Sequence, residues 1–167
     1  MMVFDASTLI LIAKMEILDS FLDGIESQVA IPAEVAKECC GVKKSLDALL
    51  IQKALDASRI RVIAVKNRKL VTKLQGDFGL GRGEAEAIVL ALAEEAPVLG
   101  IDDKNGINAC KLLGITFTTA IGGLVRMREK GHLTIGEALA KLATLGRHGR
   151  YKHSILEDAR RKLETKL

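Results

Sequence analysis

Short apolar runs alternate along the chain with longer segments in which apolar residues recur at helical spacing. The first run stops at Asp5, and an apolar helix follows it with Ser7 or Thr8 as a plausible cap. A second brief apolar run ends at Ile31, after which Pro32 opens another helix, where its missing N–H costs little. The pattern therefore begins with two units of a strand followed by a helix.

The same alternation continues to about residue 131. After a third predicted helix at 43–58, a strand at 59–65 is only partly amphipathic, and the glycine cluster in GDFGLGRG predicts a loop. The remaining predicted elements are a helix at 84–95, a strand at 97–101, a helix at 104–114, a strand at 115–118 and a helix at 120–131. Strands that alternate with helices at this spacing indicate βαβ units. We therefore predict a three-layer α/β/α sandwich with a mostly parallel central sheet.

The C-terminal part of the sequence adds helices only. They begin at about residue 134 and are joined by the basic stretch RHGRYKH. A chain of 167 residues is close to the usual size of one domain. We therefore expect a single domain over residues 1–167, with a helical C-terminal extension from about residue 134.

Composition narrows the class of protein. Hydrophobic residues make up 49% of the chain but aromatic residues only 3%, so aliphatic side chains must fill the core.

Charged residues interrupt the apolar stretch LILIAKMEILDSFL and Asp5 interrupts the opening run, so we expect no membrane span, no leader peptide and a cytoplasmic protein. Three cysteines without CxxC spacing disfavour both a disulfide framework and a zinc site. A net charge of +4 allows an anionic partner without identifying one.

Carboxylates follow or precede the predicted strands in four separate segments. Asp5 and the adjacent Asp102 and Asp103 end strands, Glu38 lies in the helix after the second strand, and Glu84 opens the helix before the Asp102 strand. Ligands of open parallel sheets bind beyond the carboxyl ends of the strands. Carboxylates gathered there would repel one another unless a divalent cation such as Mg²⁺ or Mn²⁺ bound them. Such an ion polarises a phosphate and lowers the pKa of a bound water, which suits phosphodiester hydrolysis.

The same segments carry a resemblance to a known family. VFDASTLI, IPAEVAKE, GRGEAEAIVLALA and GIDDKNGINACKLLGI resemble, in order, the four motifs of the PIN-domain nucleases, over nearly the whole chain through Gly131. The sequence looks closest to the VapC-like prokaryotic branch, in which the third motif reads GEAEAI and the fourth IDD. The resemblance implies a metal-dependent ribonuclease, often the toxin of a toxin–antitoxin pair and commonly a homodimer. RNA and an antitoxin protein are the partners it implies.

The resemblance also carries over a set of site residues by position. The carboxylates that it places in the catalytic, metal-binding set are Asp5, Glu38, Glu84 and Asp103. Asp102 remains an alternative to Asp103, and one of these two is expected to cap the next helix while the other faces the cleft. Ser7 matches a small hydroxyl residue that can orient the first aspartate or a metal-bound water. Glu34 competes with Glu38 for the second acidic position.

Other residues carry weaker expectations. Glu86 lies two positions after Glu84, so the two side chains point to different faces of a helix and do not easily share a ligand. Arg82 and Lys104 are the basic residues nearest to the proposed carboxylates, and we expect them to contact RNA phosphates. The alternative function is a non-catalytic PIN-like binding module whose acidic pocket captures a basic segment of a partner protein.

Overall fold

The computed structural model describes residues 1–42 and 44–165. Within them, five short parallel strands form one sheet in the order β3-β2-β1-β4-β5. The strands are β1 (Met2–Phe4), β2 (Val29–Pro32), β3 (Ile60–Ile63), β4 (Leu99–Gly100) and β5 (Phe117–Thr118). The predicted α/β/α sandwich is confirmed, and the sheet is entirely parallel.

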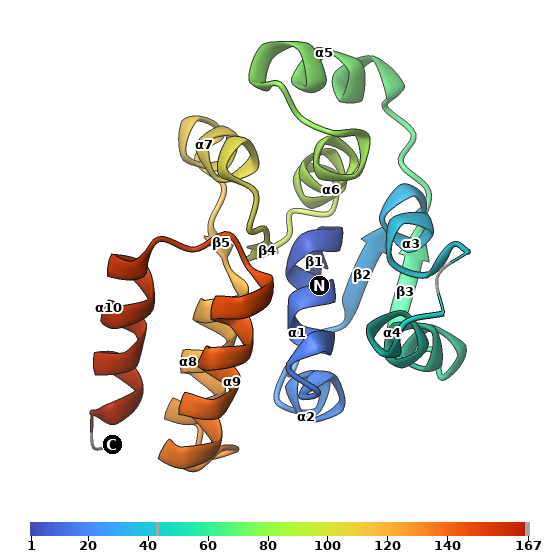
Figure 1. Cartoon of the computed structure of the whole chain (residues 1–167). Helices are drawn as coiled ribbons and strands as arrows, with labels where there is room; N and C mark the ends of the chain where they lie inside the picture. The colour runs from blue at the N-terminus through green and yellow to red at the C-terminus, as the bar shows by residue number, and fades with distance from the viewer. Residues whose placement is uncertain (43, 166–167) are drawn as a thin grey trace.

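Ten helices in the described residues surround this sheet (Figure 1). Those before β4 are α1 (Ala6–Lys14), α2 (Leu18–Asp23), α3 (Ala33–Cys40), α4 (Leu46–Asp56), α5 (Arg68–Phe78) and α6 (Arg82–Ala93). Those after β4 are α7 (Lys104–Leu113), α8 (Ala120–Glu129), α9 (Ile135–His148) and α10 (His153–Glu164). No helix in the described part of the chain is long and apolar enough to cross a membrane.

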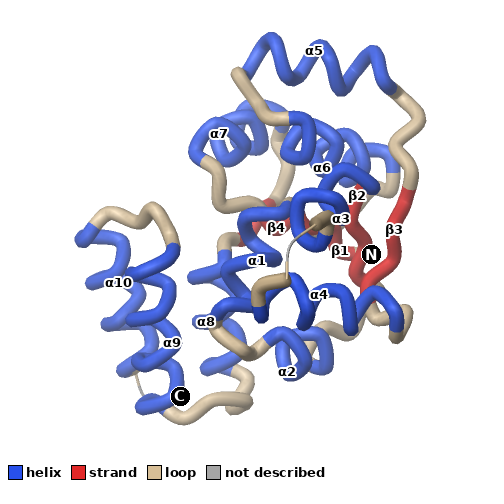
Figure 2. The backbone as a smooth tube through the Cα atoms, turned by 45° about the vertical axis from the view of Figure 1, so that its right-hand side comes forward, coloured by secondary structure: helices blue, strands red, loops and turns tan. Residues whose placement is uncertain are grey.

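Two apolar cores lie on opposite faces of the sheet, because successive strand residues point to opposite sides. Val3 belongs to the core under α5, α6 and α7, whereas Phe4 belongs to the core formed with α1 to α4 and α8 to α10. Phe4 meets Phe21 there edge to face, with the ring centroids 5.8 Å apart. Figures 1 and 2 show the two helical layers on either side of the strands, with α9 and α10 extending the layer that holds α8.

Strand order decides which carboxylates become neighbours. β1 lies between β2 and β4, and all three strands run in the same direction. Asp5, directly after β1, donates its backbone N–H to the Gly100 carbonyl of β4 at 2.9 Å. The residues that follow these central strands therefore meet at one edge of the sheet, as the predicted topology requires.

The structure differs from the sequence prediction around the glycine cluster. Helix α5 continues through Gly76 to Phe78, so the loop is confined to residues 79–81. Gly79 ends α5 in the left-handed region with φ of 65°, which glycine adopts without steric cost. The sequence prediction began the loop at Gly76, because glycine is a poor helix former. In the structure Gly76 lies inside α5, and no atom lies within 4 Å of the position that a Cβ would take there.

Gly100 should tolerate no side chain. A Cβ at this position would lie 2.2 Å from Cδ1 of the buried Phe4 ring on the neighbouring strand. We expect Gly100→Ala to lower the free energy of unfolding by about 1–3 kcal/mol, as overpacked cores do. Gly136→Ala in α9 is the matched control, because its Cβ meets nothing within 4 Å and should be neutral or stabilising. Equal unfolding midpoints in urea for the two variants would contradict this account.

Candidate active site

Asp5 is a charged residue at the centre of the fold. Its side chain is 1% exposed, and it caps α1 by accepting a hydrogen bond from the Thr8 backbone N–H at 2.8 Å. The Ser7 hydroxyl donates to its second oxygen at 2.7 Å. Burial raises the pKa of Asp5 to about 7, and the nearby charge of Asp102 adds to this rise while the hydrogen bonds oppose it. The prediction that Ser7 or Thr8 caps this helix was wrong: both lie inside α1, and the cap is Asp5, which is also a buried acid.

The two adjacent aspartates after β4 have different surroundings. Asp103 caps α7 through a 2.9 Å hydrogen bond from the Gly106 N–H, whereas Asp102 is the aspartate whose charge raises the pKa of Asp5. Asp102 accepts the Ala120 N–H at 2.8 Å and the hydroxyl of Tyr151. Burial raises its pKa, and these hydrogen bonds oppose the rise. One aspartate therefore caps the helix, as expected, but it is Asp103 that does so.

Glu84 and Glu38 approach the same edge from two helices. Burial raises the pKa of Glu84, and the charge of Asp103 raises it further. Its carboxylate folds back over Gly81, where a Cβ would lie 2.4 Å from Oε2. Glu38 lies against Gly83 in the same way, since a Cβ there would be 2.3 Å from its Oε1. Two glycines before and within α6 thus make room for two carboxylates.

A small cavity of about 500 Å³ lies beside Glu38 and Glu84, whereas Asp5, Asp102 and Asp103 are not part of its lining. Ser7, Glu38 and Glu84 all line it. The structure thus brings Glu38, and not Glu34, to the same cavity as Glu84. The charge of Asp102 raises the pKa of Asp5, and the charge of Asp103 raises that of Glu84, so these carboxylates lie near one another in two pairs.

Glu34 and Glu86 belong to a separate ionic cluster. Glu86 is 1% exposed and accepts from Arg68 of α5, from Arg82 Nε at 3.2 Å and from the Glu34 backbone N–H at 3.4 Å. Arg82 also pairs with the Glu34 carboxylate at 3.7 Å. The cluster ties α3, α5 and α6 together. It also engages the Arg82 guanidinium, which the sequence had suggested for RNA phosphates, while Lys104 is exposed.

The donor set suits a hard divalent cation. No group of three or more Asp, Glu, His or Cys side chains among residues 1–42 and 44–165 is arranged to hold a metal ion as it stands. Mg²⁺, however, commonly takes only one or two carboxylates and keeps waters in its other positions. The buried Thr8 hydroxyl has no hydrogen-bond partner of ordinary geometry within the described chain, although it lowers the pKa of both Asp5 and Asp102. This orphaned oxygen beside two buried carboxylates fits such an ion.

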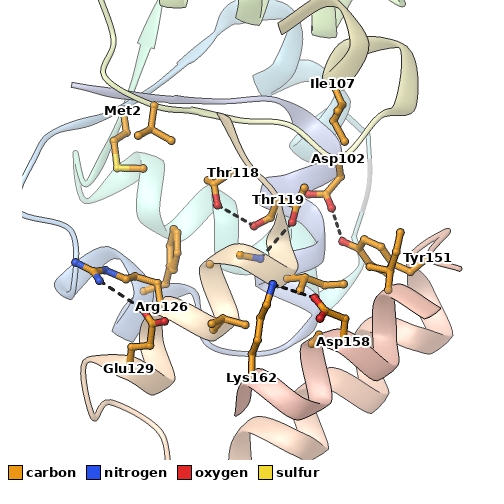
Figure 3. A pocket seen from close by; sticks show the side chains of 18 of the residues that line it. Met2, Asp102, Ile107, Thr118, Thr119, Arg126, Glu129, Tyr151, Asp158 and Lys162 are labelled. Atoms are coloured by element: carbon orange, nitrogen blue, oxygen red, sulfur yellow. Dashed lines mark hydrogen bonds and ion pairs between the residues drawn. The ribbon is translucent and has the colours of Figure 1, made fainter. Parts of the chain in front are cut away.

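A separate, larger groove of about 1360 Å³ has Asp102 in its lining (Figure 3). Residues of α7, α8 and α10 line it, together with Arg150, Tyr151 and Lys152 from the loop between α9 and α10. Sequence reasoning missed the part that Tyr151 plays. Its only sequence signal was a lone aromatic residue in the basic stretch RHGRYKH, which does not say what the ring will meet.

The comparison with protein families agrees with this architecture. A family model described as a PIN domain matches residues 1–165, so the chain belongs to the PIN-domain family. PIN domains are generally nucleases. No curated protein matches the chain.

Proposed function

We propose that the protein is a metal-dependent endoribonuclease that hydrolyses RNA phosphodiester bonds, and that it acts as the toxin of a toxin–antitoxin pair. The observation that carries the nuclease proposal is that Asp5 and Asp102, both largely buried, follow the neighbouring parallel strands β1 and β4 at one edge of the sheet. Burying two such carboxylates costs folding free energy, and a bound cation offsets that cost. The toxin role, an antitoxin partner and a homodimer rest on the motif resemblance alone, and a cytoplasmic location rests on the charged residues that interrupt the apolar stretches.

The carboxylates would hold one or two Mg²⁺ or Mn²⁺ ions. The residues assigned to this task are Asp5, Glu38, Glu84 and Asp103, with Asp102 beside Asp5. Ser7 fixes the Asp5 carboxylate through its hydroxyl. When bound, such an ion polarises the phosphate and lowers the pKa of a water. Hydrolysis then joins the water oxygen to phosphorus, breaks the bond to the leaving ribose oxygen and transfers a proton to that oxygen.

Cations near Asp102 favour an anionic strand as the substrate. The cations that line the large groove and form no ion pair within the described chain are Lys104, Lys111, Lys130, Arg150 and Lys152, of which Lys130 donates to the Gly24 carbonyl at 2.9 Å. Arg126 and Lys162, in the same groove, are instead paired with Glu129 and Asp158. Unpaired cations gain most from contact with phosphates. We therefore assign phosphate contacts to Lys104 and its unpaired neighbours, and to Arg82 only after its release from Glu34 and Glu86.

Glu84 and Glu86 offer a matched test on one helix. Glu84→Gln should reduce Mn²⁺-dependent cleavage of single-stranded RNA roughly a hundredfold, because the loss of a metal ligand costs several kcal/mol of transition-state stabilisation. Glu86→Gln should leave cleavage nearly unchanged but lower the free energy of unfolding by roughly 1–3 kcal/mol, since it weakens bonds from two arginines. Initial cleavage rates and urea unfolding measure the two effects.

The reverse outcome would contradict the assignment. If Glu86→Gln abolished cleavage in a folded protein and Glu84→Gln did not, the ionic cluster would be the active site. Wild-type protein that cleaves RNA equally well in excess EDTA would remove the role given to the metal.

A further inference from the structure

The loop between α9 and α10 brings the C-terminal extension into contact with the acidic site. The hydroxyl of Tyr151 donates to Oδ1 of Asp102 (Figure 3). The other oxygen of Asp102, Oδ2, accepts the Ala120 backbone N–H at the start of α8, at 2.8 Å. Two donors from separate segments therefore hold one carboxylate, and one of them comes from the extension.

The loop is shaped to place the Tyr151 ring. A Cβ on Gly149 would lie 2.3 Å from Cε2 of that ring and 3.0 Å from the Leu145 carbonyl oxygen. The φ of Gly149 is −89°, which any residue adopts, so close approach and not backbone conformation explains the glycine. The Gly149 N–H also donates to the Leu145 carbonyl at 2.7 Å, which fixes the turn at the end of α9.

We propose that Tyr151 is a positioning residue for the nuclease site, acting through Asp102; this inference rests on the proposed function. The χ2 torsion of an aspartate is broad, so a carboxylate with one donor can rotate about it. Donors on both oxygens fix the plane of the Asp102 carboxylate. Each oxygen has two lone pairs, so each can still contact a cation or a water after accepting one hydrogen bond.

The position of Asp102 matters because Asp5 is its neighbour. Asp5 is already held by Ser7 and by the Thr8 N–H. With Tyr151 and Ala120 holding Asp102, both members of the pair have fixed carboxylate planes. Partners that orient metal ligands in this way typically change metal affinity or activity by about 10- to 100-fold when they are removed.

Tyr151→Phe tests the proposal because it removes the hydroxyl and keeps the ring. In the full-length protein without RNA, we expect the affinity for Mn²⁺ to fall about 10- to 100-fold. Electron paramagnetic resonance of the free ion measures this affinity. The amide proton of Ala120 should move upfield in the ¹H–¹⁵N spectrum, because its acceptor is no longer held in place. Tyr151→Ala should weaken Mn²⁺ binding as much as Tyr151→Phe.

Thr144→Val is the control for a substitution that changes the C-terminal extension without touching Asp102. Its hydroxyl bonds within α9, to the Ala140 carbonyl and with Arg147, so Mn²⁺ affinity and the Ala120 resonance should stay at the wild-type values. Wild-type Mn²⁺ affinity in Tyr151→Phe would overturn the proposal. A loss of affinity in Tyr151→Ala but not in Tyr151→Phe would also overturn it, because the packing of the ring and not the hydroxyl would then be responsible. Failure of the wild-type protein to bind Mn²⁺ would contradict the proposed function instead. The Ala120 resonance would then decide alone whether Tyr151 positions Asp102, and an unmoved resonance would overturn it.

Discussion

Asp5→Asn is expected to abolish Mn²⁺-dependent RNA cleavage, with a loss of about a thousandfold or more in rate. Asp5 follows the central strand and is buried, and the charge of Asp102 raises its pKa, so the substitution removes a charge from the centre of the proposed site. An amide is a neutral and weaker ligand for a hard divalent cation than a carboxylate. A thousandfold loss in rate corresponds to about 4 kcal/mol of lost transition-state stabilisation.

The asparagine variant should remain folded, which makes the experiment interpretable. Asn is as good an N-cap as Asp, and its carbonyl oxygen can still accept the Thr8 N–H. The Ser7 hydroxyl, which donates to Asp5, can rotate to accept from the amide instead. Cleavage at the wild-type rate by a folded Asp5→Asn protein, measured with the same RNA and metal, would end the nuclease assignment.

The metal-free protein should lose stability as the pH rises from about 4 to 7. The folded pKa of Asp5 is about 7 against an ordinary value of 3.8, so the folded state binds a proton that the unfolded state has already released in this range. The associated stability is fully present below pH 4 and is lost by pH 7. At ~1.4 kcal/mol per pH unit, the effect is roughly 4 kcal/mol. Glu84 and Asp102, whose pKa values are also raised, act in the same direction.

Urea unfolding in EDTA at pH 5 and pH 8 measures this effect. Asp5→Asn should have a higher free energy of unfolding than wild type at pH 8. The difference between the two proteins should become smaller as the pH falls towards 4. Glu137→Gln is a control of opposite sign: hydrogen bonds from Thr134 lower the pKa of Glu137, so its contribution is lost as the pH falls. If the free energies of unfolding of wild type and Asp5→Asn changed with pH in the same way, the raised pKa assigned to Asp5 would be contradicted.

Most of the fold could be predicted from the sequence because the local signals agree with the global arrangement. Asp5 ends an apolar run and caps the helix that follows, and Pro32 ends β2 just before α3. Gly76 was the exception, since a glycine inside a helix reads as a breaker when the surrounding packing is unknown. Strands β4 and β5 were also predicted to be longer than they are, because apolar residues continue beyond the residues that form the hydrogen-bonded ladder.

The site was only partly predictable. Position along the strands identifies Asp5 and the Asp102–Asp103 pair, because parallel strands end at the same edge. The sequence could not decide which aspartate faces Asp5, since adjacent residues differ only in side-chain direction after the strand ends. Nor could it find the Tyr151 contact, which joins residues 49 positions apart through the packing of the C-terminal helices. Contacts of that kind depend on tertiary geometry and leave no periodic signal.

Anomalous diffraction from crystals grown with Mn²⁺ would locate a divalent ion bound to the protein. We expect a manganese peak bonded to a carboxylate oxygen of Asp5 and to at least one other carboxylate of the set at the sheet edge. Loss of that peak in Asp5→Asn crystals would support the assignment further. A wild-type crystal with no peak at this edge, or with manganese bound only at a remote surface carboxylate, would contradict it.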